Sequence, residues 1–130
     1  MIAKGTIPGR AVPWQAPTLG RNGGVNHSAR NYARYKQWLR TVADFAALSR
    51  PRGGPYAGPV SLRIVVYRRP GRGVAPDATN LQKAIEDGLQ QVIYVNDRQV
   101  RDVHTTLHVT ATEPERVEFQ VVAWEQTADE

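Results

Sequence analysis

The sequence predicts a small α/β (α+β) domain, and three observations lead to that prediction. The chain has 130 residues and no cysteine. Apolar residues recur every three or four positions in two segments, which is the spacing of one helix face, and they alternate in a third segment, which is the spacing of one strand face. A chain of this length buries roughly two thirds of its unfolded surface without disulfides. We therefore expect one domain over residues 1–130.

The first part of the chain is predicted to hold one long helix. Residues 5–16 mix large apolar residues with glycine and proline, which is typical of irregular chain or an edge strand. Residues 20–28 read as a polar loop that ends at Ser28, a favourable helix N-cap. Residues 29–48 then read as a helix. Its apolar stripe consists of Tyr35, Trp38, Leu39, Val42, Phe45 and Ala46.

One more helix and three strands are expected further along. Residues 51–59 are rich in proline and glycine and form a turn-rich connection. Residues 60–67 alternate as a half-buried strand does. The later elements are expected to be a helix over residues 80–91 and strands over 103–111 and 116–125. Residues 112–115, which include a proline, are expected to form a hairpin turn between those two strands.

The second helix is expected to begin at Thr79, because Thr79 followed by Gln82 is a capping-box pattern. Its apolar stripe consists of Leu81, Ile85, Leu89 and Val92. That stripe leaves Lys83, Glu86 and Asp87 on the polar side, with the lysine within one turn of both acids. A capped surface helix with intrahelical ion pairs also explains this pattern, so that alternative stays open.

Basic and acidic residues are unevenly distributed along the chain. Residues 1–72 contain 13 Lys and Arg and one acid, a net charge of +12, whereas residues 73–130 contain 4 bases and 11 acids, a net charge of −7. Basic surface attracts phosphates, and a separate group of acids can hold a metal ion. The distribution favours a protein that acts on nucleic acid, and an ordinary mixed surface is the alternative.

Composition excludes several classes of function. Without cysteine there is no disulfide framework, thiolate zinc site or cysteine nucleophile. No segment has the order of a signal peptide, and no apolar run approaches the ~20 residues that span a bilayer. We expect a cytoplasmic protein with no membrane partner.

Acids on both sides of the second helix suit a magnesium site. Asp77 precedes the helix, Asn96 and Asp97 follow it in an expected turn, and Asp102 stands at the start of the next strand. Mg²⁺ prefers oxygen ligands and is often bound through one or two carboxylates plus substrate phosphates. Such an ion promotes phosphodiester hydrolysis, and Lys83 is the candidate to stabilise the charge that develops.

The same stretch resembles the RusA-type Holliday junction resolvases. It reads Asp77-Ala-Thr-Asn-Leu-Gln-Lys83, then Asp87-Gly-Leu, then Asn96-Asp97-Arg-Gln-Val100. The family pattern is Asp-x-Asp-Asn-Leu-x-Lys, followed by Asp-Ala-Leu and by Asp-Asp-x-Gln-Val. The resemblance implies a mixed sheet flanked by helices, cutting of four-way DNA junctions with Mg²⁺ or its substitute Mn²⁺, and a homodimer with one site for each strand to be cut. It also implies a nucleoid-associated protein of bacterial or phage origin.

Roles for individual residues follow from this resemblance. It implies that Asp77 and Asp97 bind the metal and that Lys83 assists catalysis. Asn80 and Asp87 match further motif positions without a defined role, and Asp102, just beyond the motif, is expected to support the site. Thr79 and Asn96 stand where the family has aspartates. A neutral hydroxyl is a poor magnesium ligand, so the site binds metal less tightly, uses a neighbouring acid or is inactive.

Glu86 and Asp87 are the acids that could take over from Thr79. Glu86 lies seven residues further along the helix, which is about 10 Å at 1.5 Å per residue. Glu86 could bind only a metal ion that lies nearer the C-terminal end of the helix than Thr79. The hypothesis is therefore that Glu86 or Asp87 joins Asp77 and Asp97 in one site.

Arginines supply the expected DNA contacts. Phosphate contacts are expected from Arg30, Arg34, Arg68, Arg69 and Arg72. His104 and His108 share one strand face but stand ~13 Å apart, too far to share a metal, and are expected to be ordinary surface histidines. His27 precedes the basic helix, and the sequence leaves its role open.

Two other functions stay open at this stage. A non-catalytic junction-binding homologue, in which Thr79 marks a lost site, predicts binding without nicking. An RNA-binding or assembly module unrelated to nucleases predicts that Asp77→Asn and Asp97→Asn leave every activity unchanged.

Overall fold

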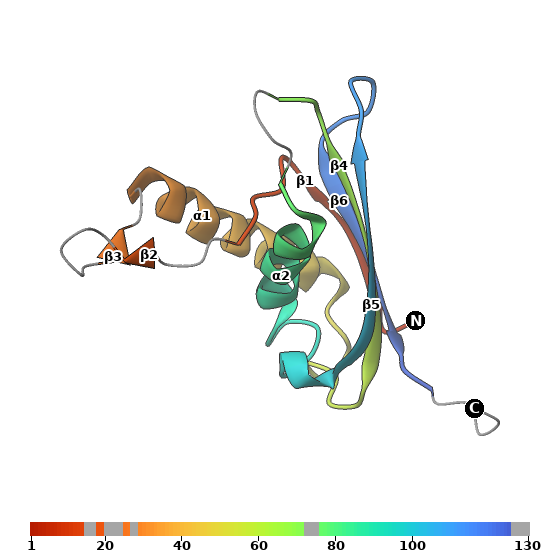
Figure 1. Ribbon diagram of the computed structural model, residues 1–130. Coiled ribbons are helices and arrows are strands. Elements are labelled where there is room, and N and C mark those ends of the chain that lie inside the picture. Colours follow the sequence, from red (N-terminus) through yellow and green to blue (C-terminus); the bar gives the residue numbers. More distant parts are fainter. Residues whose placement is uncertain (15–17, 20–24, 27–28, 72–75, 126–130) are drawn as a thin grey trace.

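The computed structural model describes residues 1–14, 18–19, 25–26, 29–71 and 76–125, and it describes only the backbone at 18–19, 25–26 and 29–30. None of the helices in these ranges has the length and hydrophobicity needed to cross a membrane. The elements in chain order, drawn in Figure 1, are β1 (Ala3–Pro8), β2 (Thr18–Leu19), β3 (Val25–Asn26), α1 (Ala29–Ala46), the 3-10 turn η1 (Ala47–Ser49), β4 (Val60–Arg68), α2 (Ala78–Leu89), the 3-10 turn η2 (Asp97–Gln99), β5 (Val100–Val109) and β6 (Arg116–Ala123).

Four strands form one mixed sheet in the order β1-β6-β4-β5. β4 pairs in parallel with β5 and antiparallel with β6, and β6 pairs antiparallel with β1. α1 and α2 lie against the same face of the sheet (Figure 1). The predicted α/β class with a mixed sheet is confirmed, with both of these helices on one side.

The predicted hairpin between the last two strands is wrong. β5 and β6 are not neighbours, because β4 lies between them. Val60, Leu62, Ile64 and Val66 are all buried along β4, so this strand occupies the middle of the sheet, where both of its edges are paired. The chain after β5 therefore crosses the end of β4, where the Thr110 N–H donates to the carbonyl of Arg68 at 2.9 Å.

The N-terminal part also differs in detail from its prediction. β1 is an edge strand, as expected, but it covers Ala3–Pro8 and leaves residues 9–14 as an irregular segment, named the arm below. The predicted loop at 20–28 contains a short strand, because Val25–Asn26 pairs with Thr18–Leu19. The expected N-cap Ser28 lies outside the described residues. The first helix is confirmed and ends at Ala46.

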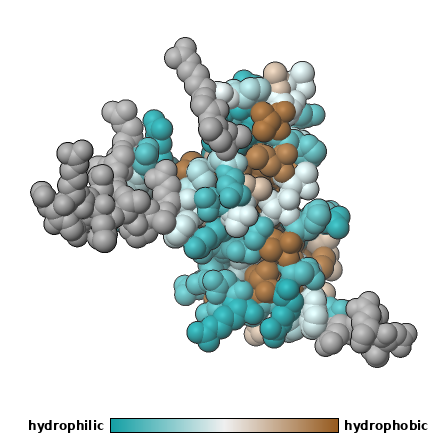
Figure 2. All heavy atoms as spheres, in the orientation of Figure 1, coloured by the Kyte–Doolittle hydropathy of each residue, from teal (hydrophilic) through white to brown (hydrophobic). Residues whose placement is uncertain are grey.

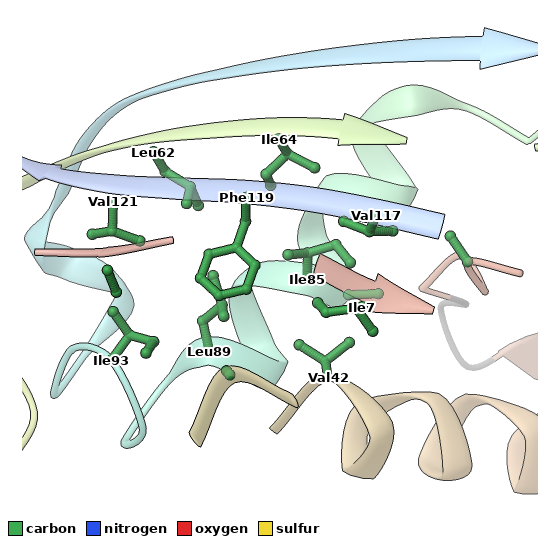
Figure 3. Close-up of a cluster of buried hydrophobic side chains, with 14 of the residues drawn as sticks. Ile7, Val42, Leu62, Ile64, Ile85, Leu89, Ile93, Val117, Phe119 and Val121 are labelled. Atoms are coloured by element: carbon green, nitrogen blue, oxygen red, sulfur yellow. The ribbon is translucent and has the colours of Figure 1, made fainter. Parts of the chain in front are cut away.

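The core fills the space between the sheet and the two helices. Phe119 of β6 lies at its centre, with strand residues on one side and helix residues on the other (Figure 3). Each such side chain contributes roughly 1.5–3 kcal/mol through its burial. The labelled neighbours of Phe119 are Ile7, Val42, Leu62, Ile64, Ile85, Leu89, Ile93, Val117 and Val121.

Gly88 marks the closest approach of the two helices. A Cβ atom at this position would lie 2.5 Å from Cγ1 and 2.7 Å from Cβ of Val42 on α1. The RusA pattern has alanine at this position, so the glycine here allows α1 to pack directly on α2. That contact fixes α2, and therefore the residues of the motif, relative to the rest of the molecule.

The opposite face of the sheet carries polar and aromatic side chains. His104 pairs with Arg63 across the sheet and His108 with Tyr67, and the last two rings stack 5.1 Å apart. Both histidines therefore face away from the helices, as expected of surface residues. In the orientation of Figure 2 the surface is largely hydrophilic, and its apolar patches are separated from one another.

Candidate functional site

The residues of the RusA-like motif lie along a single crossover, β4–α2–β5. Two parallel neighbouring strands need such a connection, and its helix runs back across the sheet in the direction opposite to both strands. The N-terminus of α2 therefore lies near the end of β4, and its C-terminus lies near the start of β5 (Figure 1). The two halves of the motif are consequently at opposite ends of α2.

Asp77 caps the N-terminus of α2. Its Oδ1 accepts the Thr79 N–H at 2.9 Å, and the helix begins at Ala78. The predicted capping box of Thr79 and Gln82 is therefore wrong. A carboxylate is an equally good cap and also interacts favourably with the positive end of the helix dipole. Gln82 instead accepts a hydrogen bond from the Thr105 hydroxyl of β5 at 2.8 Å.

Asp97 lies beyond the other end of α2, in a turn that its neighbours hold in place. Asn96 caps η2, because its Oδ1 accepts the Arg98 N–H at 2.9 Å. Gln99 completes a capping box by accepting the Asn96 N–H at 2.8 Å. The Asp97 N–H donates to Gln90 Oε1 at 3.2 Å. Asparagine in place of the family's aspartate thus supplies the cap of this turn.

Gln99 also anchors this turn to the rest of the protein. Its Nε2 donates to the carbonyls of Tyr56 at 2.7 Å and Gly58 at 2.8 Å. The buried Tyr94 adds a second anchor, because its hydroxyl donates to the carbonyl of Glu86 at 2.8 Å. The motif alone assigns no role to Gln99 or Val100. The structure gives Gln99 the role of positioning Asp97.

Three carboxylates interact near the C-terminal end of α2: Glu86, Asp87 and Asp97. Burial raises the pKa of Glu86, and the charges of the other two acids raise it further. Burial also raises the pKa of Asp87, against the lowering effects of a hydrogen bond from the Tyr35 hydroxyl and of the Lys83 charge. We name these three residues the acid cluster. It is a partly buried group of like charges, and such a group attracts a cation.

Lys83 lies next to the acid cluster but contacts an aromatic ring. Its Nζ is 3.5 Å from the centroid of the Trp14 ring, a cation–π contact. The backbone N–H of Trp14 donates to the carbonyl of Asn80 at 3.0 Å, and this hydrogen bond holds the arm against α2. Within the described residues Lys83 makes no ion pair with Glu86 or Asp87, so the intrahelical pairs of the surface-helix alternative do not form. No local sequence pattern predicts this contact of Trp14.

Not all of the predicted site residues come together in one chain. Asp77 and Gln90, the side chain that holds Asp97, are 13 positions apart, about 20 Å along the helix axis. Asp102 is exposed on β5 and lines a hollow with Arg63 and His104, on the sheet face away from the helices. In the described part of the chain no three His, Asp or Glu side chains are grouped closely enough to enclose a metal.

The described arginines that were predicted to bind DNA come from two parts of the chain. Arg68 and Arg69 end β4, and Arg34 is exposed on α1. Arg68 is half-buried, and the Arg69 N–H donates to Glu115 at 3.0 Å. Arg72, His27 and the side chain of Arg30 lie outside the described residues.

The chain matches a known protein family over most of its length. The model of the family described as Endodeoxyribonuclease RusA matches residues 8–122, which is most of the chain. No curated protein matches the chain closely enough to count as a relative. The matched region contains the arm, both helices, β4, β5 and most of β6. The chain therefore belongs to the RusA endodeoxyribonuclease family.

Proposed function

We propose that this protein is a magnesium-dependent endodeoxyribonuclease that cuts four-way DNA junctions. The observation that supports this most directly is the acid cluster beside Lys83, in a chain of a DNA-cleaving family. Metal-assisted hydrolysis of a phosphodiester needs carboxylates for the cation and a positive group near the phosphate. The motif provides both kinds of group on one face of α2.

The donor set fits a magnesium ion. Asp97, with Glu86 or Asp87, offers carboxylate oxygens, and one or two carboxylates with substrate phosphates are a common magnesium site. Burial raises the pKa values of both Glu86 and Asp87, and the Asp97 charge raises them further, which the Lys83 charge only partly offsets. When bound, the ion would supply charge neutralisation and a more acidic water, and Mn²⁺ would substitute for it. Lys83 would stabilise negative charge on the reacting phosphate.

A homodimer would account for the position of Asp77. The family pattern includes Asp77, yet in one chain it lies about 20 Å along α2 from the residue that holds Asp97. A two-fold axis that brings opposite ends of two α2 helices together would place Asp77 of one chain beside Asp97 of the other. Two such sites would be related by symmetry, as the two symmetric cuts in a junction require.

Cleavage of a labelled four-way junction tests the function. The wild-type chain is expected to make paired symmetric cuts with Mg²⁺ or Mn²⁺ and none with EDTA, and to leave a linear duplex of the same sequence intact. Cuts in the linear duplex at the same rate would contradict junction selectivity. Cuts in EDTA would contradict the role of the metal.

A junction-binding homologue without cleavage is the second candidate function. It is favoured by Thr79, which is exposed and offers no charge where the family has an aspartate. It is also favoured because, among the described residues, no three acids or histidines lie closely enough together to enclose a metal ion. The two candidates differ in one result. Tight junction binding in Ca²⁺, with no cuts in Mg²⁺ or Mn²⁺, would favour the binding protein.

Trp14 is expected to position Lys83 for the reaction. Trp14→Leu removes the aromatic face while keeping an apolar side chain, and it should slow single-turnover cleavage about three- to tenfold, because a cation–π contact contributes roughly 0.5–2 kcal/mol. Trp14→Phe keeps an aromatic face and should retain most of the rate. The measurement is the single-turnover rate at saturating protein, with junction affinity measured separately.

The comparison of leucine with phenylalanine separates positioning from folding. A purely structural role for Trp14 would make both variants lose thermal stability and junction affinity together. Equal cleavage rates for Trp14→Leu and the wild type would show that Lys83 needs no aromatic support.

A further inference from the structure

The arm and α1 enclose a groove that the motif does not explain. Two hollows of about 430 and 360 Å³ lie between them and share the lining residues Arg10, Val12 and Arg34. The first also contains Trp38, and the second also contains Arg68. We name the two together the arm groove. Its floor is apolar, and three arginines from three different elements surround it.

The charge of the arm groove is only partly compensated. Arg10 forms an ion pair with Glu115, which also accepts the Arg69 N–H. Among the described residues Arg34 and Arg68 form no ion pair. Of the three guanidinium groups, only that of Arg10 is therefore ion-paired with a carboxylate among the described residues. Positive charges on a partly buried surface are costly unless an anion or a hydrogen-bond acceptor compensates them.

Two buried donors at the groove also lack acceptors. Trp38 is 4% exposed, and within the described part of the chain its Nε1 has no hydrogen-bond partner. The same holds for Nε of Arg68. Burial and the nearby Arg10 charge lower the pKa of Arg68. Because buried polar groups are nearly always satisfied, these two donors add to the excess of donors over acceptors around the groove within the described residues.

We propose that the arm groove binds one phosphate of the DNA strand that is being cut. A phosphodiester offers the negative charge and the acceptor oxygens that Arg34 and Arg68 lack, and it can share Arg10 with Glu115; guanidinium groups match phosphate geometry. The apolar floor formed by Val12 and its neighbours suits the sugar. This proposal rests on the proposed function, because that function makes DNA the source of the phosphate.

The groove is connected to Lys83 by the arm itself. Arg10 lies in the groove and Trp14 lies against Lys83, so at most about 14 Å of chain separates the two points. A DNA strand advances about 3.4 Å per nucleotide along the helix axis. The phosphate in the groove would therefore be about four nucleotides or fewer from the one that is cut, close enough to fix which phosphodiester meets Lys83.

The test is junction binding in Ca²⁺ at several salt concentrations, which needs no cleavage. Arg34→Ala changes an exposed side chain, and Arg68→Gln keeps a donor without charge. Each should weaken binding at least about tenfold, since hydrogen bonds to charged groups are strong. The plot of log K against log salt should be less steep by about one for the double variant, because a single phosphate contact is lost.

Two further variants test the proposal. One is a matched control, and the other is expected to tighten junction binding instead of weakening it. Arg40→Ala removes the same charge from an exposed position of α1 that does not line the groove, and it should weaken binding less than about twofold. Glu115→Gln removes the acid that competes for Arg10, and it should tighten binding severalfold. General damage to the fold would not tighten binding.

Three results would overturn the proposal. The first is that Arg34→Ala and Arg68→Gln behave like Arg40→Ala. The second is that Glu115→Gln weakens binding. The third is that inorganic phosphate stabilises the wild type against heat, but not the double variant, while junction affinities stay equal, which would make free phosphate the ligand. If the groove variants bind the junction poorly and the wild type never cuts, the proposed nuclease function would be contradicted. Phosphate binding in the arm groove would still be supported.

Discussion

Asp97→Asn is expected to abolish junction cleavage while leaving junction binding intact. Loss of residues that only support metal ligands typically costs 10–100-fold, so loss of a carboxylate in the acid cluster should cost at least about 100-fold. The fold should be retained, because the contacts that hold the turn are made by the Asp97 N–H and by the side chains of Asn96 and Gln99. Cleavage in Mg²⁺ and binding in Ca²⁺ are the two measurements.

An acid outside the cluster provides the control. Asp44 is exposed on α1, and Asp44→Asn makes the same change in charge, so it should cut at the wild-type rate. Cleavage by Asp97→Asn at that same rate would remove Asp97 from the site. Glu86→Gln and Asp87→Asn, measured in parallel, then decide which of their carboxylates is required.

A mixture of Asp77→Asn and Asp97→Asn proteins is expected to regain cleavage that neither protein has alone. If each site combines Asp77 of one chain with Asp97 of the other, a mixed dimer has one site with both substitutions and one site with none. Random pairing makes half of the dimers mixed, so roughly a quarter of the wild-type sites should return. Because each mixed dimer has one working site, the product should be single nicks rather than paired cuts.

One result of the mixing experiment would contradict a site shared between two chains. If Asp77 and Asp97 act within one chain, every site in the mixed dimer is damaged and no cleavage returns. Asparagine is itself a good N-cap, so Asp77→Asn should keep α2 folded. The mixture therefore tests where the Asp77 carboxylate acts. Mixing each variant with wild-type protein is the control for subunit exchange.

Much of the candidate site could be proposed from the sequence because its signals are local. Asp77, Lys83, Asp87 and Asp97 were identified from their order along the chain, and the two long helices were predicted from apolar spacing within single segments. The N-cap of α2 was misplaced by two positions, because Asp77 and Thr79 are both good caps and only the backbone conformation selects between them. Trp14 could not be identified, since nothing near it in the sequence indicates a contact with Lys83.

The sequence by itself determined the α/β class, the RusA-like motif and the uneven distribution of charge, because each depends on residues that are close together in the chain. Only the tertiary structure decided that β6 lies between β1 and β4, that Glu86 and Asp87 face Asp97, and that Arg10, Arg34 and Arg68 surround one groove. The physical reason is that these contacts join segments distant in sequence. Their geometry is set by how the sheet and helices bury a common core, which no local pattern records.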